Sequence, residues 1–399
     1  MDSSTYYVIE SGGLDGLFSA LRERGYALIG PTVRDNTIVY DEIGGVEDLP
    51  IGWVDEQSPG RYRINKRNDQ AFFGFNIGPH SWKKFLFPPS LKLFDAIHRE
   101  DGVIFVEDGN ANPNANAASG NSTSGKLAFI GVRACELNAI LVQDKVLATG
   151  IYTDSYYASL RRDSFILAVN CGQSVGTCFC TSMNTGPRVE SGYDILITEV
   201  LGRRHYFVVQ VGSEKGREIL GGISYRDASH DEIVEAGAIV NATAASITKK
   251  MDTSGVKALL QGNPDHPQWD VVANRCLSCA NCTLVCPTCF CHTIEDTTDL
   301  TGNFAERWRK WDSCFALDFS YIHGGSIRTS RKARYRQWLT HKLANWIDQF
   351  GTSGCVGCGR CITWCPVGID ITEEVRAIQE TAARPTIRNS TEVNHHGIS

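Results

Sequence analysis

Fifteen cysteines are spread along the 399-residue chain, and eight of them lie in two matching runs. The first run reads CLSCANCTLVCP (276–287), and the second reads CVGCGRCITWCP (355–366). Both follow C-x2-C-x2-C-x3-C-P, the bacterial ferredoxin spacing in which the fourth cysteine ligates the other [4Fe–4S] cluster of a pair. The spacing therefore predicts two clusters. Their expected ligands are Cys276, Cys279, Cys282 and Cys365 for the first, and Cys355, Cys358, Cys361 and Cys286 for the second.

Paired structural zinc sites are the alternative, because C-x2-C pairs also build zinc ribbons. Zinc needs only two such pairs per site. It gives no reason for the third cysteine, the fixed fourth cysteine and the closing proline of each run. We therefore interpret both runs as iron–sulfur motifs.

Four further cysteines lie near the ends of two expected strands. Cys135 follows the apolar run LAFIGV (127–132), and Cys171 follows FILAVN (165–170). If these strands are parallel neighbours, both thiols lie at the carboxyl edge of the sheet, where open α/β sheets bind ligands. The loop CGQSVGTCFC then adds Cys178 and Cys180. Four thiols would suffice for a third [4Fe–4S] cluster; a zinc site and buried thiols that act as small hydrophobic residues are the alternatives.

The last three cysteines are Cys289, Cys291 and Cys314, with His292 beside them. Another metal site is one interpretation. Three thiols and one histidine without a recognised spacing favour the other interpretation, which is buried structural thiols.

The first 250 residues have the pattern of an α/β domain. The runs at 127–132 and 165–170 are typical of strands covered on both faces, and ELNAILVQDKVLA (136–148) has helical spacing between them. Strand, helix and strand predict a right-handed parallel βαβ core. Further strands are expected at 6–10, 194–200 and 205–211, and a helix at 231–250.

Strand-like runs end near residue 250, so we predict a mainly α-helical dicluster ferredoxin domain over 251–380. Residues 287–354 separate the two runs, which indicates a long insertion with helical segments such as 333–350. Residues 108–126, rich in Asn, Ala, Gly and Ser, are expected to form a flexible insertion in the first domain. Residues 381–399 are expected to form a loose C-terminal tail.

Composition excludes several classes of protein. The chain is 42% hydrophobic and 21% charged, as in ordinary globular proteins, and its net charge of −6 argues against nucleic acid as a main partner. The N-terminus lacks the basic start and apolar run of a secretory signal. No stretch approaches the roughly 20 apolar residues of a membrane span. We expect a cytoplasmic protein without a membrane contact, in which cysteines bind metal more readily than they form disulfides.

Two basic runs, ERWRKW (306–311) and RTSRKARYRQW (328–338), also contain aromatic residues. Nucleic-acid binding is one interpretation of these runs, but the net negative charge of the whole chain argues against it. Docking of an acidic partner protein and tuning of anionic clusters fit the runs better. We find no Gly-rich flavin or nicotinamide fingerprint, no Walker loop and no metalloprotease helix. The sequence therefore marks no catalytic residues, and one-electron transfer is the economical function.

Several segments also resemble a known family. They are GPHSWKKFLFPP (78–89), GVRACEL (131–137), CGQSVGTCFCTSM (171–183), CPTCFCHTIED (286–296), RWRKWDSCF (307–315) and CVGCGRCITWCPVGIDI (355–371). They are similar to the β subunit of cytosolic NAD(P)-linked [NiFe] hydrogenases, or sulfhydrogenases, a group that includes the corresponding subunit of the anaerobic sulfite reductases. Ala134, Glu136 and the Asn-rich insertion depart from the family pattern.

The resemblance implies an iron–sulfur electron-transfer subunit that is not catalytic alone. It would relay electrons between a flavin subunit that oxidises NAD(P)H and the small and large subunits of a [NiFe] hydrogenase. The alternatives are the corresponding subunit of an anaerobic sulfite reductase complex, and a stand-alone iron–sulfur reductase whose substrate reacts at a cluster in the N-terminal domain.

Overall fold

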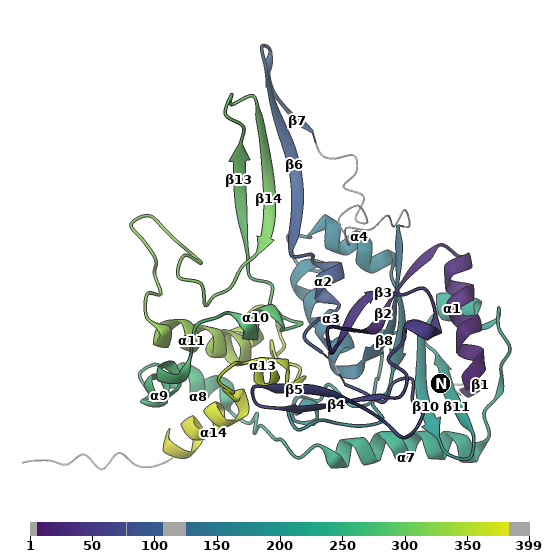
Figure 1. Cartoon of the computed structure of the whole chain (residues 1–399). Coiled ribbons are helices and arrows are strands. Elements are labelled where there is room, and N and C mark those ends of the chain that lie inside the picture. Colours follow the sequence, from purple (N-terminus) through teal and green to yellow (C-terminus); the bar gives the residue numbers. More distant parts are fainter. Residues whose placement is uncertain (1–5, 77, 107–124, 383–399) are drawn as a thin grey trace, which may run out of the picture.

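An eight-stranded mixed sheet forms the centre of the N-terminal half (Figure 1). The structure, a computed structural model, describes residues 6–76, 78–106 and 125–382. The strand order is β12-β1-β11-β10-β9-β8-β2-β3, and the four neighbours β10, β9, β8 and β2 are parallel. The strands are β1 (Tyr6–Glu10), β2 (Tyr26–Arg34), β3 (Thr37–Glu42), β8 (Lys126–Arg133), β9 (Phe165–Val169), β10 (Ile195–Leu201), β11 (His205–Val211) and β12 (Arg226–Asp227).

Helices cover both faces of this sheet, which explains why its central strands are continuous apolar runs. Leu17 and Phe18 of α1 and Ile219 of α6 pack on one face, while Leu137 of α3 and Tyr157 of α4 pack on the other. The helices of this half are α1 (Leu14–Glu23), α2 (Lys83–Leu86), α3 (Ala134–Leu147), α4 (Ser155–Asp163), α5 (Cys180–Met183), α6 (Glu214–Leu220) and α7 (His230–Ser246), with short 3-10 turns at Ser11–Gly13 and Val46–Asp48. The predicted parallel βαβ core is confirmed as β8, α3 and β9.

A second, four-stranded sheet projects from the body (Figure 1) and has the order β13-β14-β6-β7. Its strands come from both halves of the chain: β6 (Ser90–Arg99) and β7 (Gly102–Val106), then β13 (His292–Thr298) and β14 (Phe304–Trp311). Strand-like runs therefore do not end at residue 250, and that expectation was wrong. The mainly helical description of 251–380 is not confirmed, because the insertion between the cysteine runs contains this hairpin.

The rest of the C-terminal half is helical and has its own apolar core, which includes Trp269, Trp338, Leu339 and Ile362. Its helices are α8 (Val256–Gly262), α9 (Gln268–Arg275), α10 (Asn281–Leu284), α11 (Arg331–Thr340), α12 (Trp346–Phe350), α13 (Arg360–Thr363) and α14 (Ile371–Ala382), with a π turn at His341–Asn345 between α11 and α12. The predicted helix at 333–350 corresponds to α11, the π turn and α12.

A third, two-stranded sheet, β4 (Trp53–Ser58) and β5 (Arg61–Lys66), lies beside α13 and joins the two halves. The Gly60 N–H donates to Ile362 O at 3.1 Å, and Tyr62 lies 5.1 Å from Trp364 between ring centroids. The predicted flexible insertion falls almost entirely outside the described residues. So does the predicted tail, except for residues 381–382, which belong to α14.

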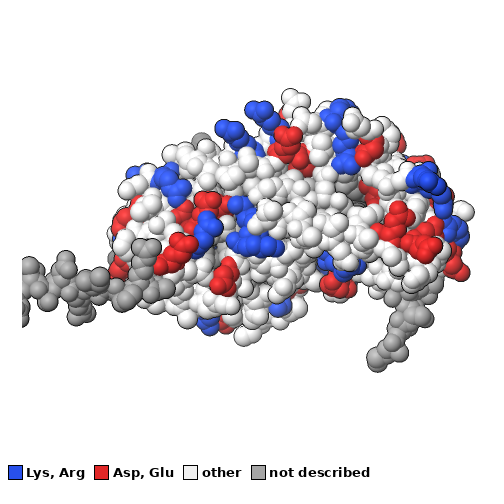
Figure 2. Space-filling model, turned by 90° about the horizontal axis from the view of Figure 1, so that it is seen from below, with Lys and Arg blue, Asp and Glu red and all other residues white. Residues whose placement is uncertain are grey.

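Several basic residues of the two runs form ion pairs within the molecule. In β14, Arg307 and Lys310 form ion pairs with Asp296 and Glu295 of β13, both at 2.6 Å. On α11, Lys332 pairs with Asp270 at 2.8 Å. On the face drawn in Figure 2, basic and acidic side chains form small mixed groups separated by uncharged surface. In the described part of the chain, no helix is long and apolar enough to cross a membrane.

Candidate iron–sulfur centres

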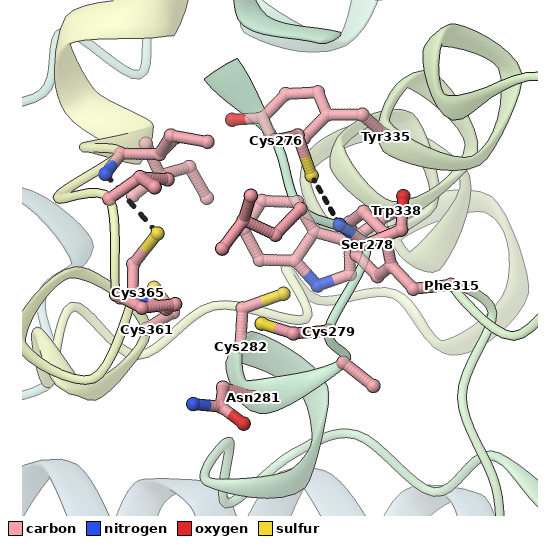
Figure 3. Close-up of a pocket in the computed structure, with 16 residues that line it drawn as sticks. Cys276, Ser278, Cys279, Asn281, Cys282, Phe315, Tyr335, Trp338, Cys361 and Cys365 are labelled. Carbon is pink, nitrogen blue, oxygen red and sulfur yellow. Dashed lines mark hydrogen bonds between the residues drawn. The ribbon is translucent and has the colours of Figure 1, made fainter. Parts of the chain in front are cut away.

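The first site lies where α9, α10 and the end of the second run meet. Its four predicted ligands, Cys276, Cys279, Cys282 and Cys365, line one cavity of about 30 Å³ (Figure 3). Phe315, Tyr335 and Trp338 supply apolar walls, and Cys361 borders the same space. The structure therefore brings together thiols from the two runs, as the crossed assignment requires.

Backbone N–H groups point at these thiols. The Ser278 N–H donates to Cys276 Sγ at 3.4 Å, and the Ile369 N–H donates to Cys365 Sγ at 3.3 Å. In the second run, the Gly357 N–H donates to Cys355 Sγ at 3.5 Å. Hydrogen bonds to ligand sulfurs stabilise thiolates and influence cluster potentials, so the donors fit iron–sulfur ligation.

Both runs fold with the same backbone. Ser278 and Ala280 have φ of 53° and 67°, and the corresponding residues of the second run, Gly357 and Gly359, have φ of 63° and 77°. Each pair of left-handed residues turns the chain around a space and precedes a short helix, α10 or α13. The repeated spacing is thus also a repeated conformation.

The second site gathers Cys355, Cys358 and Cys361 with Cys286 of the first run. All three partners act as charged neighbours on the Cys361 thiol, and burial raises the pKa of that thiol well above its usual range. Cys286 lies beside Thr288 Oγ1 at 3.1 Å and accepts a hydrogen bond from Lys342 Nζ at 3.2 Å. A buried ammonium favours a thiolate at this position.

The third set of thiols also meets. Cys135, Cys171, Cys178 and Cys180 line a cavity of about 20 Å³ at the carboxyl edge of β8 and β9, together with Cys358. Burial raises the pKa of Cys135 well above its usual range. Four thiols gathered around one small cavity suit a cluster that displaces their protons on binding.

The second and third sites are in direct contact. The Phe179 N–H donates to Gly357 O at 2.9 Å, and a Cβ at Gly357 would lie 2.7 Å from Cys180 Cα. The second run also borders the first cavity through Cys361. The second site therefore lies between the other two.

A buried ion pair stabilises the contact between the second and third sites. The Arg360 guanidinium donates to Glu136 Oε1, to Gly78 O at 2.9 Å and to His80 O at 2.7 Å, while Tyr40 donates to Glu136 Oε2. Both charged side chains have no exposed area. Glu136 follows Cys135, and Arg360 lies between Cys358 and Cys361. The departure at Glu136 therefore supplies the partner of a ferredoxin-run arginine.

The last three cysteines are also close to one another. Cys289 and Cys314 are buried and Cys291 is half-buried, and all three line a larger cavity of about 360 Å³. A hydrogen bond from the Cys314 thiol lowers the pKa of Cys291 to about 7. In the described part of the chain, no three His, Cys, Asp or Glu side chains converge tightly enough to hold one ion.

Sequence reasoning missed the buried charges around the sites, Arg360, Lys342 and Lys83. No local pattern marks a buried basic residue whose partner is remote in sequence. For Cys289 and Cys291, one signal in the sequence was available, because the tetrapeptide TCFC occurs twice, at 177–180 and at 288–291.

Comparison with known proteins agrees with the geometry. A family model described as a 4Fe-4S dicluster domain matches residues 275–369, which include both runs. The chain is 27% identical over 377 residues to the sulfhydrogenase 2 subunit beta of Pyrococcus furiosus, and this alignment covers 93% of the chain and 98% of the relative. A shorter match, 30% identical over 102 residues, links 24% of the chain to 25% of the F420-dependent formate dehydrogenase 1 subunit beta of Methanococcus maripaludis. The chain is therefore a homologue of a sulfhydrogenase beta subunit, and it carries a 4Fe-4S dicluster domain.

Proposed function

We propose that the chain is a non-catalytic electron-transfer subunit with three [4Fe–4S] clusters, which passes electrons between redox partners in a cytoplasmic hydrogenase complex. One cluster would be held by Cys276, Cys279, Cys282 and Cys365, and the next by Cys355, Cys358, Cys361 and Cys286. Cys135, Cys171, Cys178 and Cys180 would hold the third. Such clusters supply one-electron chemistry.

This proposal rests on how the three sites are arranged, with the second site next to both the first and the third. The second run borders both the first cavity, through Cys361, and the third cavity, through Cys358. A protein built to reduce a substrate at one centre does not need a series of centres in contact. A relay needs this arrangement, because each electron must pass from one centre to the next.

The protein's own residues prepare this path. The buried Arg360 and Lys342 place positive charge beside Cys358 and Cys286, and backbone N–H groups donate to three of the sulfurs. Both features favour the more negative, reduced state of a cluster. Phe315 and Trp338 give the first site apolar walls.

For the partners, we propose a flavin subunit that oxidises NAD(P)H at one end and the small and large subunits of a [NiFe] hydrogenase at the other. The support is the full-length similarity to a protein named as a sulfhydrogenase subunit. Sulfite reductase subunits are the alternative partners, and purification of the native complex distinguishes the two sets of partners.

The test is anoxic purification of the native complex, followed by mass spectrometry and electron-transfer assays. We expect flavin and hydrogenase subunits in the complex, and NAD(P)H-dependent hydrogen production that is lost when Cys178 and Cys180 are both replaced by Ser. Turnover of sulfite or another small substrate by the isolated chain with a reduced dye would contradict the relay. A complex with sulfite reductase subunits would contradict the hydrogenase assignment alone.

A further inference from the structure

The tetrapeptide TCFC occurs at 177–180 and again at 288–291. In the first copy, Cys178 and Cys180 join Cys135 and Cys171 around the third cavity. In the second copy, Cys289 and Cys291 join Cys314 around the 360 Å³ cavity. Both copies thus place a Cys-x-Cys pair beside thiols from elsewhere in the fold.

Both copies are also anchored on residues in or directly before the second ferredoxin run. The Thr177 and Thr288 side chains have no exposed area. Thr177 Oγ1 lies 2.9 Å from Thr363 Oγ1, and Thr288 Oγ1 donates to Gly354 O at 2.6 Å. The two tetrapeptides therefore flank the segment 354–363, so each positions its cysteine pair next to the same cluster motif.

The segment that follows the β13–β14 hairpin supplies Cys314, the third thiol beside the second copy. The pair His292 and Trp311 closes the hairpin ladder, and the Asp312 N–H donates to Cys291 O at 2.9 Å. This pairing brings Cys314 to Cys291, and their thiols share a hydrogen bond. Cross-strand register thus joins residues that are distant in the sequence.

Two buried lysines make this spot electropositive. Lys342 Nζ donates to Cys286 Sγ at 3.2 Å and to Cys289 Sγ at 3.6 Å. Lys83 Nζ donates to Cys289 O at 3.1 Å and to Leu284 O at 3.3 Å, and lies 4.0 Å from the centre of the Trp311 ring. Among the described contacts of these ammonium groups there is no carboxylate. Buried charges require compensation, which thiolates bound to a metal centre would provide.

We propose that Cys289, Cys291 and Cys314 hold a further iron–sulfur cluster whose fourth ligand is not a cysteine. The three sites of the proposed function use twelve of the fifteen cysteines, and these three complete the set. The fourth position then faces the cavity, which the basic side chains of Arg328 and Lys342 also line. A cavity with cationic walls beside an open iron would take a small anionic ligand. The inference goes beyond electron relay, because it assigns a ligand-binding centre.

The test begins with iron and acid-labile sulfide counts on anoxically reconstituted chain. We expect about 16 irons per chain for four clusters, and a loss of about 4 irons in the double variant Cys291→Ser and Cys314→Ser. Ser320→Ala, a change in the same cavity that removes no thiol, should keep the full count. In Mössbauer spectra of the wild-type chain, cyanide should shift one iron in roughly sixteen, because three-cysteine ligation leaves one iron accessible.

A wild-type count of about 12 irons that is unchanged in the double variant would overturn the inference. So would a Cys291–Cys314 disulfide in the anoxic protein, measured as a mass lower by two hydrogens. Either result leaves the proposed relay intact, because its clusters use other cysteines. If the double variant fails to fold, the cyanide experiment on the wild-type chain decides whether the three-cysteine cluster is present.

Discussion

Two residues occupy equivalent positions of the cysteine runs, but only one of these positions requires glycine. Ala280 and Gly359 both have left-handed backbone conformations, with φ of 67° and 77°. A Cβ at Gly359 would lie 2.4 Å from Thr177 O, which belongs to the other half of the molecule. Glycine at 359 is therefore required by a close approach, whereas alanine at 280 carries only conformational strain.

Gly359→Ala should destabilise the protein by roughly 3 kcal/mol, since strain and a backbone collision add. Ala280→Gly, the matched change in the first run, should alter stability by less than about 1 kcal/mol, because relief of strain offsets the added freedom of the unfolded chain. Anoxic thermal unfolding measures both. Equal effects of the two substitutions would show that the contact with Thr177 does not determine the loss of stability.

Replacement of Cys286 tests the crossed assignment. Cys286→Ala should remove the cluster of Cys355, Cys358 and Cys361 first, because the Cys286 thiol lies with that group. Cys365→Ala should remove the cluster of the first run instead. The variants Cys279→Ala and Cys358→Ala identify the EPR signal of each cluster. The assignment is wrong if Cys286→Ala gives the spectrum of Cys279→Ala.

At the residue scale, the ferredoxin spacing predicts two ligand sets that cross between the runs, and the structure places the thiols of the first set around one cavity. The buried Lys342 and Arg360 could not be predicted. Their partners, Cys286 and Glu136, are remote in the sequence and become neighbours only after the elements pack.

Among the elements, α3 and α13 are joined by the buried pair Glu136 and Arg360. Arg360→Met should cost about 3–5 kcal/mol, because it leaves the Glu136 carboxylate buried without a cation. Adding Glu136→Gln should recover part of this loss. Glu214→Ala is the control, since its ion pair with Arg217 is exposed and should change stability by less than about 0.5 kcal/mol. Additive effects of the two buried substitutions in anoxic denaturant unfolding would argue against coupling.

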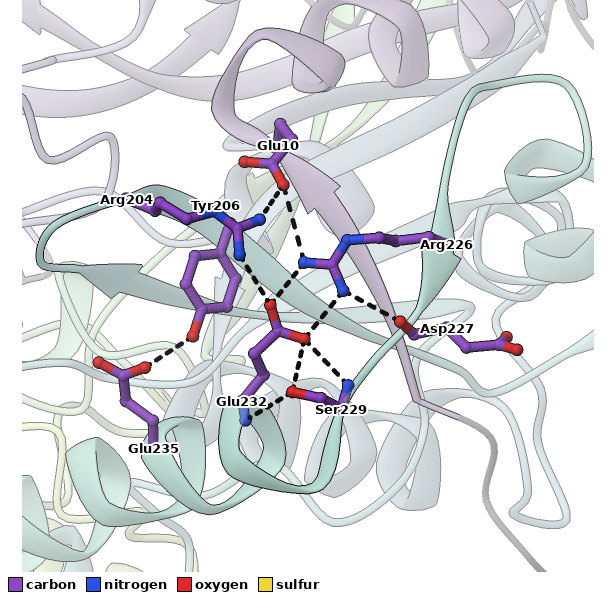
Figure 4. Close-up of polar contacts among 8 residues, drawn as sticks. All are labelled: Glu10, Arg204, Tyr206, Arg226, Asp227, Ser229, Glu232 and Glu235. Carbon is purple, nitrogen blue, oxygen red and sulfur yellow. Dashed lines mark hydrogen bonds and ion pairs between the residues drawn. The ribbon is translucent and has the colours of Figure 1, made fainter.

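The start of α7 is held by a second polar network (Figure 4). Glu232 accepts hydrogen bonds from Arg226 Nη1 at 2.9 Å and from the Ser229 N–H at 2.9 Å, which completes a capping box. Hydrogen bonding from the Arg226 guanidinium lowers the pKa of this carboxyl to about 2. Because the carboxylate is the stabilising form, its contribution is complete above the ordinary pKa of about 4.5 and is lost as the pH falls toward 2.

Glu232→Gln should therefore lower stability by roughly 1 kcal/mol, a value limited by the exposure of Arg226. Thermal unfolding of both proteins between pH 5 and pH 8 should show a constant difference, because the carboxylate stays ionised over this range. A difference that shrinks steadily from pH 8 to pH 5 would contradict the assigned pKa.

Elements were predictable where burial is two-sided or periodic. The run 127–132 within β8 and the strand β9 are apolar throughout, and residues 136–148 of and beside α3 have helical spacing, so their patterns were clear. β13 and β14 were missed because charged residues interrupt any apolar run or alternation in them, and cross-strand ion pairs such as Asp296 with Arg307 stabilise them. That pairing becomes visible only once the register is known.

Over the whole molecule, cysteine distribution separates two kinds of core. The two apolar clusters on either face of the eight-stranded sheet contain no cysteine among the described residues. The core of the C-terminal half includes Cys276 and Cys314, and several further cysteines pack against it. The sheet should thus be stable by hydrophobic burial, whereas the C-terminal half should depend on cluster assembly.

Removal of iron by an anoxic chelator should therefore unfold the molecule unevenly. We expect hydrogen exchange in α9, α10 and α13 to accelerate by at least roughly tenfold, because metal binding contributes to the stability of that half. Exchange in β1, β10 and β11 should change little, and these strands, which do not end at a proposed cluster ligand, serve as the internal control. Peptide-resolved exchange of the iron-loaded and iron-free chain measures both. Uniform acceleration across the sheet and the helices would show that the whole chain, and not one half of it, depends on the clusters.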